Sequence, residues 1–178
     1  MPGTLLAYSS VDGQTLRICS RLRQLLEAAG QSVTLFEITP ASSIDLALFD
    51  VVVIGASVRY GKHRAEVIDF TRLHSTELGS KHCAFFSVNV VARKAGKNTP
   101  EGNAYLQAFL KRTGWNPPLL GVFAGRIDYP RYHFLDRHVI RLIMWITNGP
   151  TDLSSCTEFT DWKAVDKFAS EVAKLGKS

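Results

Sequence analysis

The sequence predicts an α/β fold: a three-layer sandwich with a five-stranded parallel sheet at its centre. Short apolar segments alternate with segments of helical periodicity along the 178 residues, which is the pattern of βαβ units. The segment FDVVVIGA (49–56) is apolar nearly throughout, as expected for a parallel strand covered on both faces. Five strands in a chain of this length fit the order 2-1-3-4-5 within one domain spanning residues 1–178.

The individual elements follow from local patterns. Apolar or alternating runs predict strands at residues 4–8, 32–38, 49–56, 83–91 and 119–124. Helical spacing of apolar residues predicts helices from Leu16 to a C-cap at Gly30, and at residues 64–78, 102–113 and 161–175. Residues 125–152 exceed the roughly 2–6 residues of an ordinary connection. We therefore expect a helical insertion after or within the fifth strand.

Composition narrows the class of protein. Hydrophobic residues make up 46% of the chain and charged residues 21%, which provides a core and argues against wholesale disorder. No apolar run approaches the roughly 20 residues that cross a bilayer, and the first residues lack the pattern of a secretory signal. Cys19, Cys83 and Cys156 are too widely spaced for a disulfide framework, which favours reduced thiols in a cytosolic compartment. The histidines lack metal-ligand spacing, so we expect no metal.

The loop after the first strand combines hydroxyl side chains with a glycine and runs directly into a helix. Backbone N–H groups at the start of a helix favour a phosphate, and a glycine lets the backbone approach it closely. An ordinary N-cap is the alternative, because Ser, Asp and Thr are good caps. The loop has neither a Walker ending nor GxGxxG, which disfavours a dinucleotide. The candidate phosphate-binding residues are Ser9, Ser10, Val11, Asp12, Gly13, Gln14 and Thr15.

The string SVDGQT (10–15) resembles the phosphate loop of flavodoxins, in which FMN is bound. Asp12 replaces a hydroxyl residue of that pattern, and a carboxylate repels a phosphate. We therefore expect either that Asp12 turns away and bonds the backbone, or that this loop differs in detail from the flavodoxin pattern.

In a flavodoxin-like fold, the loops after the third and fourth strands flank the flavin ring. Tyr60 offers an aromatic face, and hydroxyl and amide groups can bond the ring edge. The candidates in these loops are Ser57, Val58, Arg59, Tyr60, Gly61, Ser87, Val88, Asn89 and Val90. Arg59, Arg93 and Lys94 place cations near the same opening, although solvated basic loops are the alternative.

The insertion contains a short, basic and aromatic amphipathic segment, FLDRHVIRLIMWITN (134–148). Its apolar positions recur at helical spacing, as in helices that lie in a membrane interface. The residues expected to contact a membrane or a quinone are Leu135, Val139, Leu142, Ile143, Trp145 and Ile146. Packing on the protein's own sheet and self-association into a homo-oligomer are the alternatives. Nucleic acid is disfavoured, because the cations alternate with large aliphatic side chains.

Longer strings carry a more specific resemblance. VVIGASVRYG (52–61), FFSVNVVARK (85–94), GRIDYPRYHFLDRHVIRLIMW (125–145) and TDW (160–162) closely resemble the flavodoxin-like, quinone-dependent protoporphyrinogen oxidases of bacteria. The match covers nearly the whole chain and departs at Val11 and at the pair Lys62-His63. It implies FMN-mediated oxidation of protoporphyrinogen IX to protoporphyrin IX in haem biosynthesis, with electrons passed to menaquinone or ubiquinone. It also implies a peripheral place on the cytoplasmic face of the bacterial inner membrane.

The resemblance also suggests roles for charged residues. A guanidinium group suits the two propionates of the substrate. The candidates are Arg59, Arg93, Lys94, Arg126 and Arg131. His63 and His133 are the candidate bases for a pyrrole proton, which can otherwise go to water.

Three other functions fit the fold. A flavodoxin-type electron carrier is one, although such carriers are usually acidic and this chain has a pI of 9.2. An FMN-dependent NAD(P)H:quinone reductase and a non-catalytic membrane adaptor are the others.

Overall fold

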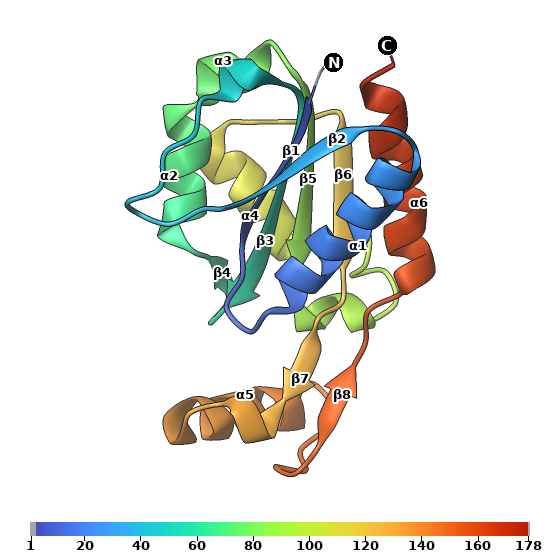
Figure 1. Ribbon diagram of the computed structural model, residues 1–178. Coiled ribbons are helices and arrows are strands. Elements are labelled where there is room, and N and C mark those ends of the chain that lie inside the picture. Colours follow the sequence, from blue (N-terminus) through green and yellow to red (C-terminus); the bar gives the residue numbers. More distant parts are fainter. Residues whose placement is uncertain (1–2, 178) are drawn as a thin grey trace.

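Five parallel strands in the order β2-β1-β3-β5-β6 form the centre of the computed structural model, which describes residues 3–177 (Figure 1). Each pair of neighbours in this path is parallel. The strands are β1 (Gly3–Ser9), β2 (Ser32–Glu37), β3 (Phe49–Arg59), β5 (His82–Val88) and β6 (Leu119–Phe123). This is the predicted order 2-1-3-4-5, because the extra strand β4 (Lys62–His63) only pairs with the end of β3.

Helices cover both faces of the sheet (Figure 1). On one face α1 (Gln14–Ala28) packs beside α6 (Trp162–Leu175), and on the other lie α2 (Ala65–Leu73), α3 (Ser75–Gly79) and α4 (Ala104–Thr113). Successive side chains of a strand point to opposite faces. Val51 and Val53 accordingly enter the core under α1 and α6, while Val52 and Ile54 enter the core under α2 and α4. Burial on both sides explains why β3 is apolar in sequence.

The end of β3 forms a tight hairpin with β4 that the sequence did not predict. Val58 pairs with His63 and Arg59 pairs with Lys62. The two residues of the turn, Tyr60 and Gly61, have φ angles of 51° and 77°. Positive φ at both positions is the requirement of the two-residue hairpin turn that matches strand twist. This hairpin fixes the position of the Arg59 and Tyr60 side chains.

Two predicted elements end elsewhere. The helix expected at 64–78 is divided at His74, which separates α2 from α3. The strand expected at 83–91 stops at Val88, and Asn89 then caps the 3-10 helix η2 (Val90–Arg93) by accepting from the Ala92 N–H. A second 3-10 helix, η1 (Leu46–Leu48), precedes β3. At the second of these ends a polar side chain bonds the backbone, whereas the side chain of His74 bonds the carboxylate of Glu77.

The insertion lies beyond the carboxyl ends of the strands, between β6 and α6 (Figure 1). It comprises β7 (Arg126–Asp128), η3 (Tyr129–Arg131), α5 (Phe134–Ile146) and β8 (Cys156–Glu158). Because β7 and β8 pair antiparallel, the inserted structure continues past the expected limit of residue 152. A small core of Ile127, Tyr129, Tyr132 and Met144 holds it together.

Three properties of the described residues, 3–177, bear on function. No helix among them is long and apolar enough to cross a bilayer. They contain no group of three or more His, Cys, Asp or Glu side chains able to hold a metal ion. Cys19 and Cys83 are buried free thiols, whereas Cys156 is exposed.

Candidate functional site

The loop after β1 leads into α1 at a helix start that no side chain caps. Gly13 is the N-cap, with a φ of 83°, and its N–H donates to the Ser10 hydroxyl at 3.0 Å. The hydroxyls of Ser9 and Thr15 are buried and have no hydrogen-bond partner among the described residues. A buried unpaired hydroxyl calls for an explanation, and an anion at the helix start supplies one. This geometry favours phosphate binding over an ordinary N-cap.

The carboxylate of Asp12 bonds a guanidinium group rather than the backbone. Arg59 Nη1 lies 2.6 Å from Asp12 Oδ2. The expected bond from Asp12 to the backbone was therefore wrong, because the β3–β4 hairpin brings a cation beside this loop. The pairing places a positive charge next to Asp12 and reduces the repulsion that this carboxylate exerts on a phosphate.

A narrow cavity of about 40 Å³ lies between the three predicted loops. Most of the predicted cofactor residues meet there. It is lined by Ser10, Asp12, Gln14, Thr15, Ser57, Val58, Val88, Asn89, Val90, Gly125 and Arg126. The last two come from the start of the insertion, so the inserted segment closes one side. Ser57 joins two of the loops, because its hydroxyl accepts from the Val11 N–H at 3.3 Å.

Four predicted cofactor residues, two of which line this cavity, are engaged within the protein. The Ser87 hydroxyl and the Asn89 amide bond each other at 3.1 Å, and Asn89 also bonds Asn103. These side chains shape the wall of the site from inside instead of offering free groups to a ring edge. Gln14 bonds Glu158 and Thr160, which ties the phosphate loop to β8 and the residues after it. Gly61 lies in the hairpin turn.

Arg59 is the centre of a cluster that joins the phosphate loop and the β3–β4 hairpin to the insertion. Its Nη2 lies 3.0 Å from Asp136 Oδ2 on α5, and its guanidinium faces the rings of Tyr60 and Tyr132 at 5.5 and 5.1 Å. The Tyr60 hydroxyl also donates to Asp136. This hydrogen bond and the nearby Arg59 hold the pKa of Asp136 below its usual value. The cluster fixes α5 against the site.

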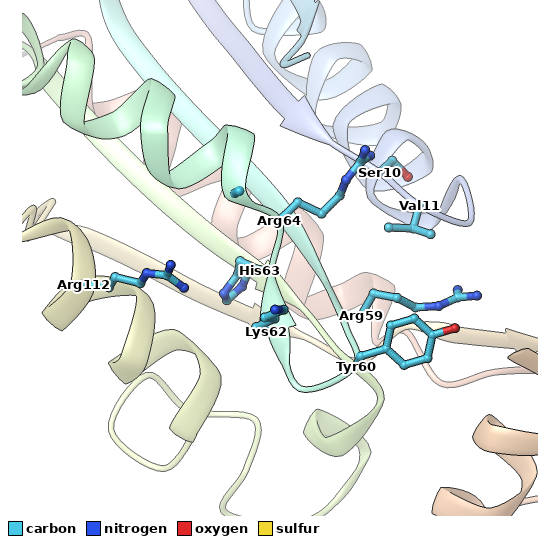
Figure 2. Close-up of a pocket in the computed structure, with 9 residues that line it drawn as sticks. Ser10, Val11, Arg59, Tyr60, Lys62, His63, Arg64 and Arg112 are labelled. Carbon is cyan, nitrogen blue, oxygen red and sulfur yellow. The ribbon is translucent and has the colours of Figure 1, made fainter. Parts of the chain in front are cut away.

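A second cavity, of about 460 Å³, opens on the other side of the hairpin (Figure 2). The loop after β1, the β3–β4 hairpin, the start of α2 and the end of α4 surround it. Its lining contains four cations and no acidic residue: Ser10, Val11, Arg59, Tyr60, Lys62, His63, Arg64, Ala65 and Arg112. Only Arg59 had been predicted as a substrate ligand.

The two candidate bases lie in different places. His63 is 5% exposed, and its Nε2 lies 2.9 Å from the Ser87 hydroxyl. Burial lowers the pKa of His63 to about 4, so the imidazole is neutral near pH 7. His133 stands exposed before α5 and lines neither cavity. The structure brings His63 to the site and leaves His133 outside it.

The remaining predicted substrate cations are engaged or remote. Arg93 donates to the Val90 carbonyl and to both oxygens of Thr147, so it joins η2 to the end of α5. Burial lowers the pKa of this guanidinium. Arg126 pairs with Asp128 at 2.9 Å. Lys94 and Arg131 are exposed and line neither cavity.

The apolar stripe of α5 is unpartnered among the described residues. Met144 is the buried residue of this helix and packs into the small core of the insertion. The opposite side chains are exposed, from 40% for Ile143 to 76% for Leu135. They are Phe134, Leu135, Val139, Leu142, Ile143, Trp145 and Ile146. The expected alternative, a helix packed on its own sheet, does not describe this face.

Sequence reasoning missed several residues of the site. Asp136 has a weak signal, because an acidic residue in the first turn suits a helix start. Tyr132 lies in a string with no helical or strand period. Lys62, Arg64 and Arg112 come from separate elements, and no linear spacing reveals that they face one cavity.

The sequence is similar to a family model and to proteins of known name. The flavodoxin domain model matches residues 5–154. A Leishmania major protein named protoporphyrinogen IX dehydrogenase (quinone) is 43% identical, over 98% of this chain and 76% of that protein. The protein of the same name from Escherichia coli K12 is 41% identical, over 97% of this chain and 95% of its own.

A solved structure supports the fold. The two-electron reduced flavodoxin of Megasphaera elsdenii superposes with a TM-score of 0.59 at 15% identity, over 96% of this chain and 98% of that one. The domain match and this likeness indicate a flavin cofactor. The chain therefore belongs to the flavodoxin-domain family of protoporphyrinogen IX dehydrogenases (quinone).

Proposed function

We propose that this protein oxidises protoporphyrinogen IX to protoporphyrin IX, with FMN as its cofactor and a membrane quinone as its electron acceptor. Relatives that match nearly the full chain bear the name of this activity. The structural observation that carries the proposal is the uncapped start of α1 with the unpaired hydroxyls of Ser9 and Thr15. It lies beside a larger cavity lined by cations.

The residues present fit FMN rather than a dinucleotide. The first turn of α1 offers backbone N–H groups to one phosphate, and the loop has no GxGxxG pattern. Tyr60 is 55% exposed at the hairpin turn, so part of its ring is accessible to an aromatic ligand beside the Arg59 guanidinium. When bound, FMN supplies the two-electron redox chemistry, and the protein positions it.

Proton release needs no dedicated base in this arrangement. His63 lines the larger cavity, yet its pKa near 4 disfavours the imidazolium at neutral pH. A base of that strength captures few protons at pH 7. We therefore assign the pyrrole proton to solvent and the imidazole to the wall of the cavity, where it packs against Phe85 and Phe109.

We further propose that α5 attaches the protein to an anionic membrane surface, at the cytoplasmic face of the inner membrane. The exposed apolar stripe would enter the interface, where a quinone is also found. Arg141 is exposed on this helix and Arg131 is exposed shortly before it, and Arg141 borders a hollow with Leu142 and Trp145. Cations beside an apolar stripe match a negatively charged lipid surface.

Anaerobic turnover tests the oxidase. The protein is loaded with FMN and given protoporphyrinogen IX with or without a short-chain menaquinone or ubiquinone, and porphyrin fluorescence is followed. Formation of porphyrin that requires both FMN and quinone supports the proposal. If FMN is bound and reducible but no porphyrin forms, the oxidase is excluded. NADPH oxidation in place of porphyrin formation would identify a quinone reductase. If neither reaction occurs, the function that remains is that of an electron carrier.

A further inference from the structure

The larger cavity has a charge that its own protein groups do not balance. Arg59 is neutralised by Asp12 and Asp136, and the Arg64 Nε lies 2.5 Å from Glu66 Oε1. Lys62 and the Arg112 guanidinium have no hydrogen-bond or ion-pair partner among residues 3–177. Two unpaired cations thus face one cavity that has no acidic lining residue.

The start of α2 adds to the positive potential. Ala65, the first residue of α2, lines the cavity, and its N-cap Arg64 forms no side-chain capping bond. The N-terminal end of a helix carries a partial positive charge on its free N–H groups. Figure 2 shows Lys62 and His63 between Arg64 on one side and Arg112 on the other. An anion in this space meets cationic groups from three elements.

The other walls are not suited to a small hydrated ion. Val11 and Tyr60 are exposed at 39% and 55%, and they meet the cavity together with Ala65 and the neutral ring of His63. Such a lining fits a ligand with an apolar body and carboxylate ends. A volume of about 460 Å³ accommodates a large part of such a molecule.

We propose that this cavity is the carboxylate subsite for the tetrapyrrole substrate, in which Lys62 and Arg112 bind the propionates. The inference rests on the proposed function and deepens it. Arg112 can bind a carboxylate with two parallel hydrogen bonds, whereas Lys62 acts as a point charge. The ring of the substrate then lies toward Tyr60 and the flavin-side loops. The flavin phosphate has a separate position at the start of α1.

Equilibrium binding of the porphyrin product separates charge recognition from shape. Protoporphyrin IX and its dimethyl ester have the same ring, and only the first carries carboxylates. Both are titrated in the same detergent solution into the FMN-loaded protein, and quenching of their fluorescence is recorded. The variants are Lys62→Gln, Arg112→Gln and the double variant, with Lys111→Gln as control. Lys111 is an exposed neighbour on α4 that does not line the cavity.

We expect each cavity variant to weaken binding of the diacid about tenfold, which is the usual effect of one charge-assisted hydrogen bond. Binding of the dimethyl ester, FMN affinity and the Lys111→Gln protein should stay unchanged. Arg112→Lys should recover part of the diacid affinity, because it restores the charge without the planar fork.

Three results in the cavity variants would overturn the subsite. They are an equal loss of affinity for the diacid and the ester, an unchanged affinity for the diacid, or a loss of FMN affinity that parallels the loss for the diacid. Its failure is distinguishable from failure of the oxidase. Turnover by the wild-type protein with unchanged diacid binding in the double variant rejects the subsite alone. Diacid binding that depends on Lys62 and Arg112, without any turnover, rejects the oxidase and leaves a tetrapyrrole-binding site.

Discussion

Arg59 and Asp136 lie 77 residues apart in the sequence, yet Arg59 Nη2 is 3.0 Å from Asp136 Oδ2. Because the other nitrogen of the same guanidinium bonds Asp12, one side chain connects the phosphate loop, the β3–β4 hairpin and α5. The insertion is therefore fastened to the phosphate loop and the hairpin at the N-terminal end of its helix. At the other end, Arg93 joins η2 to Thr147, so α5 is held at both ends.

Removing the charge of Asp136 tests this connection. In Asp136→Asn the carboxylate that accepts from both Arg59 and Tyr60 is lost, and the start of α5 should separate more often from the hairpin. We expect faster hydrogen exchange in α5 and weaker FMN retention, with unchanged exchange in α1 and α6. Hydrogen exchange read by mass spectrometry measures the first effect, and titration with FMN measures the second. Asp152→Asn is the control, because Asp152 bonds Ser154 within the insertion. Equal effects of the two variants would contradict the connection.

The unpaired hydroxyls of the phosphate loop predict opposite effects on stability and on binding. In flavin-free protein, Thr15→Val removes a buried hydroxyl that bonds nothing among the described residues, so the free energy of unfolding should rise by about 1 kcal/mol. FMN affinity should fall about tenfold, because the phosphate loses a donor. Denaturant unfolding and FMN titration measure the two effects. Ser20→Ala, on the exposed side of α1, should leave FMN affinity unchanged. Undiminished FMN affinity in Thr15→Val would remove this hydroxyl from the phosphate site.

Much of the fold is predictable from the sequence because a buried face of a helix or strand requires apolar residues at regular spacing. The apolar run of β3 and the helical spacing of α6 each report a face that packs against the sheet. The short strands β4 and β8 have no such apolar pattern, since each has exposed side chains and depends on a partner strand. The division at His74 is likewise hidden, because the residues on either side keep a helical composition.

Only the part of the site that is formed by residues adjacent in sequence is predictable. The phosphate loop follows from a strand, a glycine and a helix start that are adjacent in sequence. Whether a basic side chain is free to bind a ligand depends instead on partners that are distant in sequence and close only in the fold. Arg93 resembles a ligand in sequence but is occupied by Thr147, whereas Arg112 lies in an unremarkable helix and faces a cavity. No linear pattern distinguishes these two arginines.

Burial of His63 predicts a pH dependence of stability. Its pKa is lowered from 6.5 to about 4 in the folded protein, so the unfolded chain binds the proton more readily. Stability should therefore fall as the pH decreases from 6.5 towards 4, by about 2 kcal/mol between pH 7 and pH 5. Urea unfolding at the two pH values measures this. In His63→Phe that part of the change should vanish, whereas exposed His138→Gln should keep it. An unchanged pH dependence in His63→Phe would mean that the imidazole is not buried in its neutral form.

The exposed stripe of α5 predicts binding to anionic vesicles. Trp145 and Leu142 are 71% and 56% exposed, and placing a carboxylate at either position opposes entry into a lipid interface. Trp145→Asp and Leu142→Asp should each reduce sedimentation with phosphatidylglycerol vesicles at least tenfold. Arg141→Glu should have a smaller effect that high salt abolishes, because it acts through surface charge. Leu48→Asp is the control, since Leu48 is 70% exposed on η1, outside the insertion.

The main competitor of membrane binding is contact between two copies through the same helix. Sedimentation velocity without lipid separates them, because a dimer buries the stripe and a membrane-bound monomer does not. A wild-type monomer that sediments with anionic vesicles supports attachment, and Trp145→Asp should then stay monomeric and remain in the supernatant. A wild-type dimer that Trp145→Asp dissociates, without any vesicle binding, would assign the stripe to self-association. Vesicle binding that survives both aspartate variants would exclude α5 as the attachment surface.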